Sequence, residues 1–244
     1  MENNKEAIRI NKYLALSGFC SRRAADEYVA QGVVAIDGVT ATNGSKVIPG
    51  QVVTVNGTEL KPNEDYRIYA FYKPVGYISS LSDEQGPGIG RFLPGDIRLF
   101  PVGRLDKDSE GLMLLTNDGD LMNSILKASN GHEKEYVVTT EQPVTYDFLN
   151  KMEKGVPITN GATGKKVITA PCKTRKISDC QFGITIIQGL NRQIRRMCGY
   201  FNYKVIGLKR IRIMNISVSG LKEGELRELS ESEISELRKM LGQR

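Results

Sequence analysis

Residues 103 to 120, GRLDKDSEGLMLLTNDGD, place four aspartates and one glutamate around a short apolar run. Asp106 follows an arginine by two positions and precedes a stretch with the composition of a buried strand, whereas Asp108 and Glu110 have the pattern of exposed loop charges. A lone carboxylate can act as a covalent nucleophile or general base where a cation keeps it ionised and water is excluded. The same residues also fit an ordinary ion pair between Arg104 and Asp106, and the local pattern leaves both readings open.

The inventory of side chains narrows the possible chemistry. The chain of 244 residues contains one histidine, His132, which excludes a histidine-based triad and a multi-histidine metal site within one chain. The four cysteines lack the paired short spacing of a zinc site, so we expect buried free thiols at Cys20, Cys172, Cys180 and Cys198. Any reaction must therefore use carboxylate, phenol and guanidinium groups, and we expect no metal.

The chain has a net charge of +6, and its positive charge is concentrated in one part of the sequence. Between positions 181 and 222 there is no acidic residue and there are eight basic ones, namely Arg192, Arg195, Arg196, Lys204, Lys209, Arg210, Arg212 and Lys222. Like charges on one surface repel each other, so this stretch favours a polyanionic partner. Nucleic acid is the commonest such partner.

Apolar periodicity and turn signals divide the chain into two domains, residues 1–62 and 63–244. The first is predicted to begin with two short helices, followed by hairpins that turn at Asp37-Gly38 and Asn56-Gly57. Residues 60–69 contain a proline and two acids and are predicted to be a linker. The first domain is thus a small α+β unit.

The second domain mixes strand and helix patterns that do not alternate as regular βαβ units. We therefore expect a mixed, mostly antiparallel β-sheet with flanking helices, which is an α+β fold. Strand patterns fall at 67–74, 112–116, 135–140, 182–188 and 211–217, and helix patterns at 119–127, 143–152, 191–201 and after Ser230, where Glu233 completes a capping box. The Gly/Pro-rich residues 82–96 are predicted to form an irregular surface loop that could order on a partner.

No apolar stretch approaches the roughly 18 to 20 residues that cross a bilayer. The first thirty residues are too charged and too helically patterned for a signal peptide. We therefore expect a cytoplasmic protein that does not associate with membranes.

Several segments carry a family resemblance. SGFCSRRAADEYVAQGVVAIDG, residues 17–38, resembles the signature of the S4-type RNA-binding domain. GRLDKDSEGLMLLTNDG, HEKEYVV and GLNRQIRRMCGYFNYKV resemble, in order, three motifs of the RsuA-like family of ribosomal pseudouridine synthases, whose members carry an S4-type domain in front. GLNRQIRRM followed by LKRIRIMNI is most similar to the subgroup that modifies 23S ribosomal RNA and whose relatives can also take a tRNA.

The resemblance implies isomerisation of uridine to pseudouridine in RNA, in which the N1-glycosidic bond breaks and the sugar is rejoined through C5 without a cofactor. It implies that Asp106 attacks C1′ or takes the C2′ proton, and that Arg195 pairs with Asp106 and keeps it ionised. Tyr136 would stack on the uracil and could assist the final proton removal. Arg104 would fill the gap that the flipped nucleotide leaves in its helix.

The other basic residues are implied to contact RNA. They are Lys134, Arg192, Arg196, Lys209, Arg210 and Arg212 in the second domain and Arg9, Lys12, Arg22 and Arg23 in the first. The role of Arg192 is open, because Asn191-Arg192 replaces the Gly-Arg that is common in pseudouridine synthases.

Two other functions fit parts of the sequence. A non-catalytic RNA-binding assembly factor could use both domains as a clamp, but it would not need Asp106, Tyr136 and Arg195 together. A nucleoside glycosidase could use Asp106 and Asp108 as a carboxylate pair, although the second lies in a charged segment with no apolar wall to raise its pKa. We expect a monomeric enzyme whose partner is RNA, with 23S ribosomal RNA as the first candidate and tRNA or 16S ribosomal RNA as alternatives.

Overall fold

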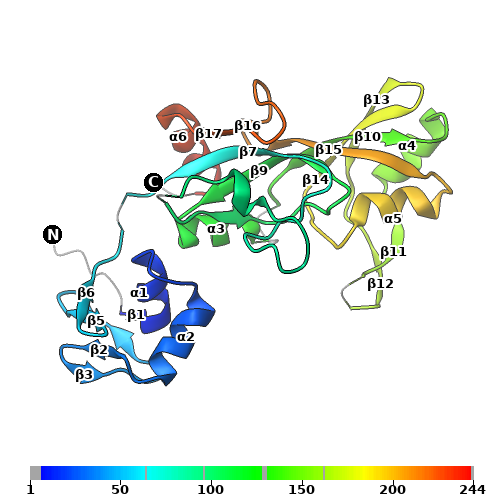
Figure 1. Ribbon diagram of the computed structural model, residues 1–244. Helices are drawn as coiled ribbons and strands as arrows, with labels where there is room; N and C mark the ends of the chain where they lie inside the picture. Colours follow the sequence, from blue (N-terminus) through cyan, green and yellow to red (C-terminus); the bar gives the residue numbers. More distant parts are fainter. Residues whose placement is uncertain (1–6, 64, 96, 128–130, 162, 243–244) are drawn as a thin grey trace. The chain divides into compact units, whose positions relative to one another are not determined.

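The computed structural model describes residues 7–63, 65–95, 97–127, 131–161 and 163–242 (Figure 1). The chain divides into two compact units, and the main boundary falls between Tyr66 and Arg67, within the predicted linker. The short segments 95–98 and 117–119 group with the first unit and the remainder with the second.

The first unit is built from short elements with local signals. Helices α1 (Ile10–Leu16) and α2 (Arg22–Ala30) accompany a four-stranded sheet of order β3-β2-β5-β6 and a β1–β4 pair. The strands are β1 (Ile8–Arg9), β2 (Val34–Ile36), β3 (Val39–Thr40), β4 (Lys46–Val47), β5 (Val53–Val55) and β6 (Thr58–Leu60). Both predicted hairpin turns are confirmed, since all four of their central residues have positive φ, as such two-residue turns require: Asp37 and Asn56 at 49° and Gly38 and Gly57 at 80°.

The second unit is organised around one large sheet. Its described strands number nine, in the order β13-β14-β10-β15-β9-β7-β17, with β8 beside β9 and β16 beside β15. The strands are β7 (Ile68–Lys73), β8 (Phe100–Val102), β9 (Glu110–Thr116), β10 (Lys134–Thr140), β13 (Lys173–Ser178), β14 (Gln181–Ile186), β15 (Val205–Ile213), β16 (Ile216–Ser217) and β17 (Leu226–Glu228). β15 and β9 are parallel and the other pairs are antiparallel, so the predicted mixed, mostly antiparallel sheet is confirmed.

Helices flank this sheet, as Figure 1 shows. They are α3 (Gly119–Leu126), α4 (Tyr146–Glu153), α5 (Gln193–Tyr200), α6 (Glu231–Met240) and the 3-10 turn η1 (Ile89–Phe92), and a small hairpin of β11 (Pro157–Thr159) and β12 (Lys166–Ile168) accompanies α5. The predicted capping box is confirmed: the Ser230 hydroxyl accepts the Glu233 N–H, and the Glu233 carboxylate accepts the Ser230 N–H. Apolar residues of β7, β9, α3 and α6 share one core cluster, which fixes the middle of the sheet.

Two predicted segments differ from the structure. The expected single strand over 211–217 is wrong, because β15 begins earlier and Met214, with φ of 51°, turns the chain into β16. The Gly/Pro-rich residues 82–96 are not merely an irregular surface loop, since Ile89 within them is fully buried. A Cβ atom on Gly90 would lie 2.2 Å from the Leu81 carbonyl oxygen, so glycine allows this segment to fold tightly on itself.

All four cysteines are free thiols, as predicted, but only Cys20 and Cys198 are buried, whereas Cys172 and Cys180 are half-buried. Within the described ranges, no helix is long and apolar enough to cross a membrane.

Candidate active site

Asp106 lies in the loop that joins β8 to β9, and the flanking residues hold this loop by partly buried hydrogen bonds. The Ser79 hydroxyl accepts the Leu105 N–H at 2.9 Å and donates to the Leu105 carbonyl at 2.7 Å. After the aspartate, the Ser109 N–H donates to the Asp106 carbonyl at 3.1 Å, which closes a turn. The backbone on both sides of the carboxylate is therefore fixed before any substrate binds.

Lys73 also holds this loop, a role that was not predicted from the sequence. Its side chain is fully buried at the end of β7, and its ammonium donates to the carbonyls of Pro74 at 2.9 Å and Ser109 at 2.7 Å. Burial lowers the pKa of Lys73 to about 8, against the opposing attraction of Asp106 and Asp108. A lysine that ends an apolar strand pattern is the signal that the sequence carries for such a buried cation.

Two arginines of the α5 region reach the loop that carries Asp106, and their partners differ from those predicted. The Arg192 Nη1 atom lies 3.6 Å from Asp106 Oδ2. Arg195 instead donates to the carbonyls of Val205 at 3.0 Å and Asp108 at 2.8 Å. The predicted ion pair between Arg195 and Asp106 is therefore wrong, because Arg192, in the left-handed N-cap conformation with φ of 49°, is the arginine directed at that carboxylate.

Asp108 is an exposed residue of the loop, as expected, but it also makes ion pairs that were not predicted. It accepts two hydrogen bonds from Arg192, at 3.1 and 2.9 Å, and its Oδ2 lies 3.4 Å from Arg195 Nη2. The hydrogen bonds from Arg192 hold the pKa of Asp108 below its usual value, with burial opposing and Arg195 adding to the shift. A glycosidase acid needs a raised pKa, so Asp108 does not suit the carboxylate-pair alternative.

Glu110, the other expected loop charge, begins β9 and is half-buried. Its carboxylate accepts the Tyr72 hydroxyl at 2.5 Å, which links β9 to β7. Burial, followed by this hydrogen bond, raises the pKa of Tyr72. Glu110 is therefore part of the sheet rather than of the loop.

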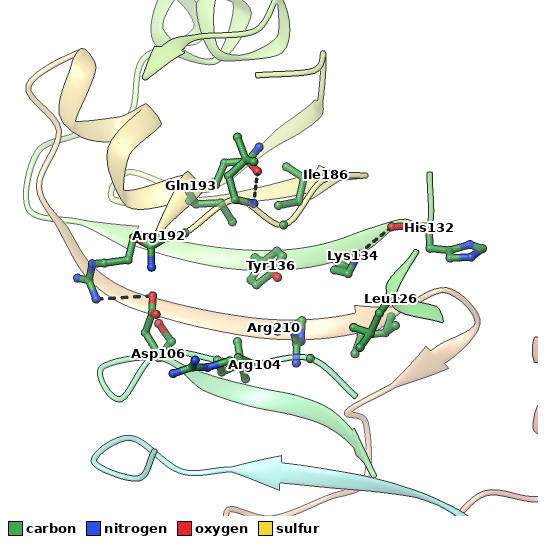
Figure 2. A pocket seen from close by; sticks show the side chains of 18 of the residues that line it. Arg104, Asp106, Leu126, His132, Lys134, Tyr136, Ile186, Arg192, Gln193 and Arg210 are labelled. Atoms are coloured by element: carbon green, nitrogen blue, oxygen red, sulfur yellow. Dashed lines mark hydrogen bonds and ion pairs between the residues drawn. The ribbon is translucent and has the colours of Figure 1, made fainter. Parts of the chain in front are cut away.

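A cavity of about 550 Å³ opens beside Asp106, and Figure 2 shows the side chains that line it. Asp106 is the one carboxylate among the described lining residues, while Arg104, Lys134, Arg192 and Arg210 bring positive charge. Tyr136, on β10, is 8% exposed and presents its ring to the same space. The structure thus brings together one carboxylate, one phenol and several cations in a pocket of the size that holds a small ring ligand.

The basic residues between positions 181 and 222 lie in more varied environments than predicted. Arg210 is buried, at 3% exposure, and Arg212 is paired with Glu133 and Glu135 at 2.9 and 3.0 Å, so neither presents a free surface charge. Their contacts with RNA stay a prediction. Lys209 lies on the other face of β15, with its ammonium 4.7 Å from the centre of the Tyr72 ring. Arg196 contacts Asn191 and does not line the cavity.

The predicted RNA-binding residues of the first domain all lie in the first unit. Arg9, Arg22 and Arg23 are exposed and Lys12 is half-buried. Every residue that lines the cavity belongs to the second unit, so the pocket is built without the first.

Comparison with known proteins agrees with this arrangement. Residues 67–200 match the family described as RNA pseudouridylate synthase, and residues 8–53 match the S4 domain. The chain is 49% identical over 237 residues to the dual-specificity RNA pseudouridine synthase RluF of Escherichia coli (strain K12), with 96% of this chain and 80% of that protein covered. It is 34% identical over 235 residues to the ribosomal large subunit pseudouridine synthase B of Bacillus subtilis (strain 168), with 94% and 95% covered.

A solved structure gives the same result for the fold. The crystal structure of a pseudouridylate synthase superimposes with a TM-score of 0.70 at 29% identity, covering 94% of this chain and 99% of that one. The predicted resemblance to ribosomal pseudouridine synthases with an S4-type domain is confirmed. The chain belongs to the RNA pseudouridylate synthase family and is an RNA-modifying isomerase with an S4 domain in front.

Proposed function

We propose that Asp106 is the carboxylate with which this RNA pseudouridine synthase opens the glycosidic bond of a uridine in 23S ribosomal RNA. One observation carries the catalytic part of this proposal: Asp106 faces a cavity in which it is the one carboxylate among the described lining residues, with the Arg192 guanidinium 3.6 Å away. A nearby cation favours the ionised carboxylate, which is the form that can attack carbon or accept a proton.

In the reaction, the flipped nucleotide enters the cavity and places its sugar beside Asp106. The carboxylate attacks C1′ or takes the C2′ proton, and the bond between C1′ and uracil N1 breaks. The detached uracil then turns and bonds to C1′ through C5. Tyr136 provides the flat wall on which the uracil stacks, because its ring is buried along one side of the pocket. Such a pocket limits the space in which the released base can turn, so that it stays beside the sugar.

Two neighbouring arginines have supporting roles: one positions the loop that carries Asp106, and the other acts on the RNA helix. Arg195 is a positioning residue in this proposal, since it donates to the backbone of Asp108 rather than to a substrate. Arg104 is exposed and lines the cavity two residues before the catalytic carboxylate. From there it can enter the RNA helix and fill the space that the flipped nucleotide leaves.

The choice of RNA follows from the relatives. The Bacillus subtilis relative is a large-subunit synthase and the Escherichia coli relative has dual specificity, so we propose 23S ribosomal RNA as the main substrate and tRNA as a second one. The exposed Arg9, Arg22 and Arg23 of the S4 unit would contact phosphates and add affinity. We also propose that the protein acts as a monomer in the cytoplasm.

Substitution of Asp106 by asparagine tests the proposed mechanism. Asp106→Asn keeps the shape of the side chain and removes its charge, so RNA binding should persist while turnover is lost. Formation of the C5 bond expels the hydrogen at C5, so turnover is measured as tritium released from RNA that carries [5-³H]uridine. The variant should release none above background.

Asp108→Asn is the matched control, because it changes the same kind of side chain two residues away in the same loop. It frees Arg192 and Arg195 from their partner but leaves the proposed nucleophile intact, so we expect a loss of about tenfold, or about 1.4 kcal/mol of activation free energy. Tritium release by Asp106→Asn at a rate near that of the unsubstituted enzyme would show that Asp106 is not the catalytic group. Mapping pseudouridines in ribosomal RNA and tRNA from a strain that lacks the protein would identify the substrate.

A further inference from the structure

Arg210 combines deep burial with an unmet hydrogen-bonding group. The residue is 3% exposed, its Nε atom donates to the Leu112 carbonyl at 2.6 Å, and its Nη2 atom is buried without a hydrogen-bond partner in the described structure. A buried charged donor left without an acceptor costs free energy, so such a group calls for an explanation. Because Arg210 lines the cavity beside Asp106, a ligand in that cavity can supply the missing acceptor.

The sheet holds Arg210 rigidly in this position. On one side its β-sheet partner is Tyr136, so both side chains face the pocket, and on the other side its partner is Gly111. A Cβ atom on Gly111 would lie 2.2 Å from the Arg210 carbonyl oxygen, and Gly111 has φ of 103°, so glycine is what allows β9 to pack this closely. Figure 2 shows Arg210 on its strand between Tyr136 and the loop of Asp106.

A second cation reinforces the positive character of this part of the pocket. Lys134 lines the cavity from β10, and burial, followed by the charge of Arg210, lowers the pKa of its ammonium. Two partly desolvated cations on adjacent strands repel each other, so the pocket favours a ligand that carries acceptor oxygens and gains negative charge. A uracil ring has two such oxygens, O2 and O4.

We propose that Arg210 is a further catalytic residue that donates to a carbonyl oxygen of the flipped uracil and stabilises the uracil anion that leaves C1′. The inference rests on the proposed function, because it requires the glycosidic bond to break in this cavity. When that bond breaks, its electron pair stays on N1 and spreads onto O2 and O4. A fixed donor aimed at an oxygen where charge develops lowers the barrier to that step.

The charges balance on both routes open to Asp106. Either the Asp106 carboxylate forms a bond to C1′, or it takes the C2′ proton and leaves a C1′=C2′ double bond. The uracil anion then bonds to C1′ through C5, which releases Asp106 from C1′ or returns the proton from Asp106 to C2′. The C5 hydrogen finally leaves as a proton and N1 gains one, so Arg210 meets a full negative charge only while the base is detached.

The test compares two leaving groups in single-turnover reactions. Fluorine at C5 withdraws electrons and makes the departing base a more stable anion, so 5-fluorouridine at the target position needs less help from a cation than uridine does. Arg210→Met should slow cleavage of the uridine bond by about 10²-fold and that of the 5-fluorouridine bond by a clearly smaller factor. Loss of the starting nucleoside is measured by chromatography after nuclease digestion.

Lys209→Met is the matched control, because it removes one positive charge from the next position of the same strand on its other face. Any loss it causes should be the same for both nucleosides. Equal losses for both nucleosides with Arg210→Met would overturn the inference and leave Arg210 as a structural link between β15 and β9. If Arg210→Met does not fold, as judged by thermal unfolding, Arg210→Lys gives the same comparison, and equal losses there also overturn it.

Failure of the proposed function looks different. In that case the unsubstituted enzyme would convert neither nucleoside, or Asp106→Asn would remain active, whatever the result with Arg210. An unequal loss with Arg210→Met in an enzyme that makes pseudouridine supports both.

Discussion

The two units of this protein differ in that the second contains buried arginines as well as exposed ones. In the first unit, Arg22 and Arg23 are exposed on helix α2. In the second unit, Arg195 and Arg210 are largely buried, and both donate to backbone carbonyls of the central sheet or its loops. Residues of one type therefore supply open charge in one region and fixed geometry in the other.

This difference separates affinity from chemistry. Exposed arginines gain binding energy by displacing the counterions of a polyanion, an effect that falls with salt and requires little precision. Buried arginines lose their hydration and are stable where fixed hydrogen bonds replace it, so they position neighbouring groups accurately. We expect substitutions in the first unit to change binding and substitutions around the pocket to change the rate of the chemical step.

Among the substitutions that compare the two units, the largest effect is expected at Arg195, whose side chain is 12% exposed. Arg195→Leu removes the hydrogen bonds to the Val205 and Asp108 carbonyls and frees the loop that holds Asp106. Displacement of a reacting group by about 1 Å can cost roughly 10²-fold in rate. We therefore expect a fall of that size in kcat, measured by tritium release at saturating RNA, with a lower midpoint of thermal unfolding.

Arg192→Leu is the companion substitution, at a side chain that is 41% exposed. It removes the cation 3.6 Å from Asp106 but leaves the two backbone contacts of Arg195 in place, so we expect about a tenfold loss. A larger loss at Arg192 than at Arg195 would contradict the claim that buried arginines set the geometry of the site, because a half-exposed arginine would then matter more to the chemical step than a buried one.

The intermediate effect is on binding by the first unit. Replacing Arg22 and Arg23 together by glutamine removes two exposed charges, and each lost phosphate contact reduces the slope of log K against log salt by roughly 0.7 to 0.9. We expect weaker RNA binding at low salt, a shallower slope, and an unchanged kcat at saturating RNA. Filter binding at several salt concentrations measures the first two quantities.

Substitution of Lys151 and Lys154 by glutamine provides the control for net charge. Both lysines are exposed near the end of α4, and Lys151 is already paired with Asp147. If this variant changes the salt slope as much as the Arg22 and Arg23 variant does, the effect comes from total charge and not from α2.

The first unit was predictable because its signals are local. Ser21 caps the helix that begins one residue later, and the Asp37-Gly38 and Asn56-Gly57 turns each join strands that are adjacent in the chain. Such contacts depend on a few neighbouring residues, whose conformational preferences are visible in the sequence. The family resemblance then added the expected RNA-binding role.

The active site was predictable in membership but not in contacts. Motif positions supplied Asp106 and Tyr136 through the resemblance, and both line the pocket. The sequence could not tell which arginine faces which aspartate, because this depends on the left-handed conformation of Arg192 and on the packing of α5 against a loop more than eighty residues earlier.

The burial of Arg210 escaped prediction for a similar reason. It follows from the position of β15 between β9 and β10, a sheet order that joins segments far apart in the chain. From the sequence alone, a run of basic residues therefore predicts one uniformly charged surface. Only the strand pairing shows that alternate residues face opposite sides of the sheet.

The smallest effect concerns a charge pair that serves stability alone. At the start of α6, Glu233 accepts two hydrogen bonds from Arg227, at 2.8 and 2.7 Å, and caps the helix with Ser230. The hydrogen bonds from Arg227 are the main cause that lowers the pKa of Glu233 to about 2, although burial opposes the shift. A carboxyl with a lowered folded-state pKa stabilises the fold above its unfolded pKa, and this contribution fades as the pH falls through the folded value.

Glu233→Gln should therefore reduce the free energy of unfolding at pH 7 without changing kcat, and the difference from the unsubstituted protein should shrink between about pH 4.5 and pH 2. Urea denaturation at a series of pH values measures this difference, and one that stays constant down to pH 2 would show that the pair with Arg227 does not contribute to stability through its charge.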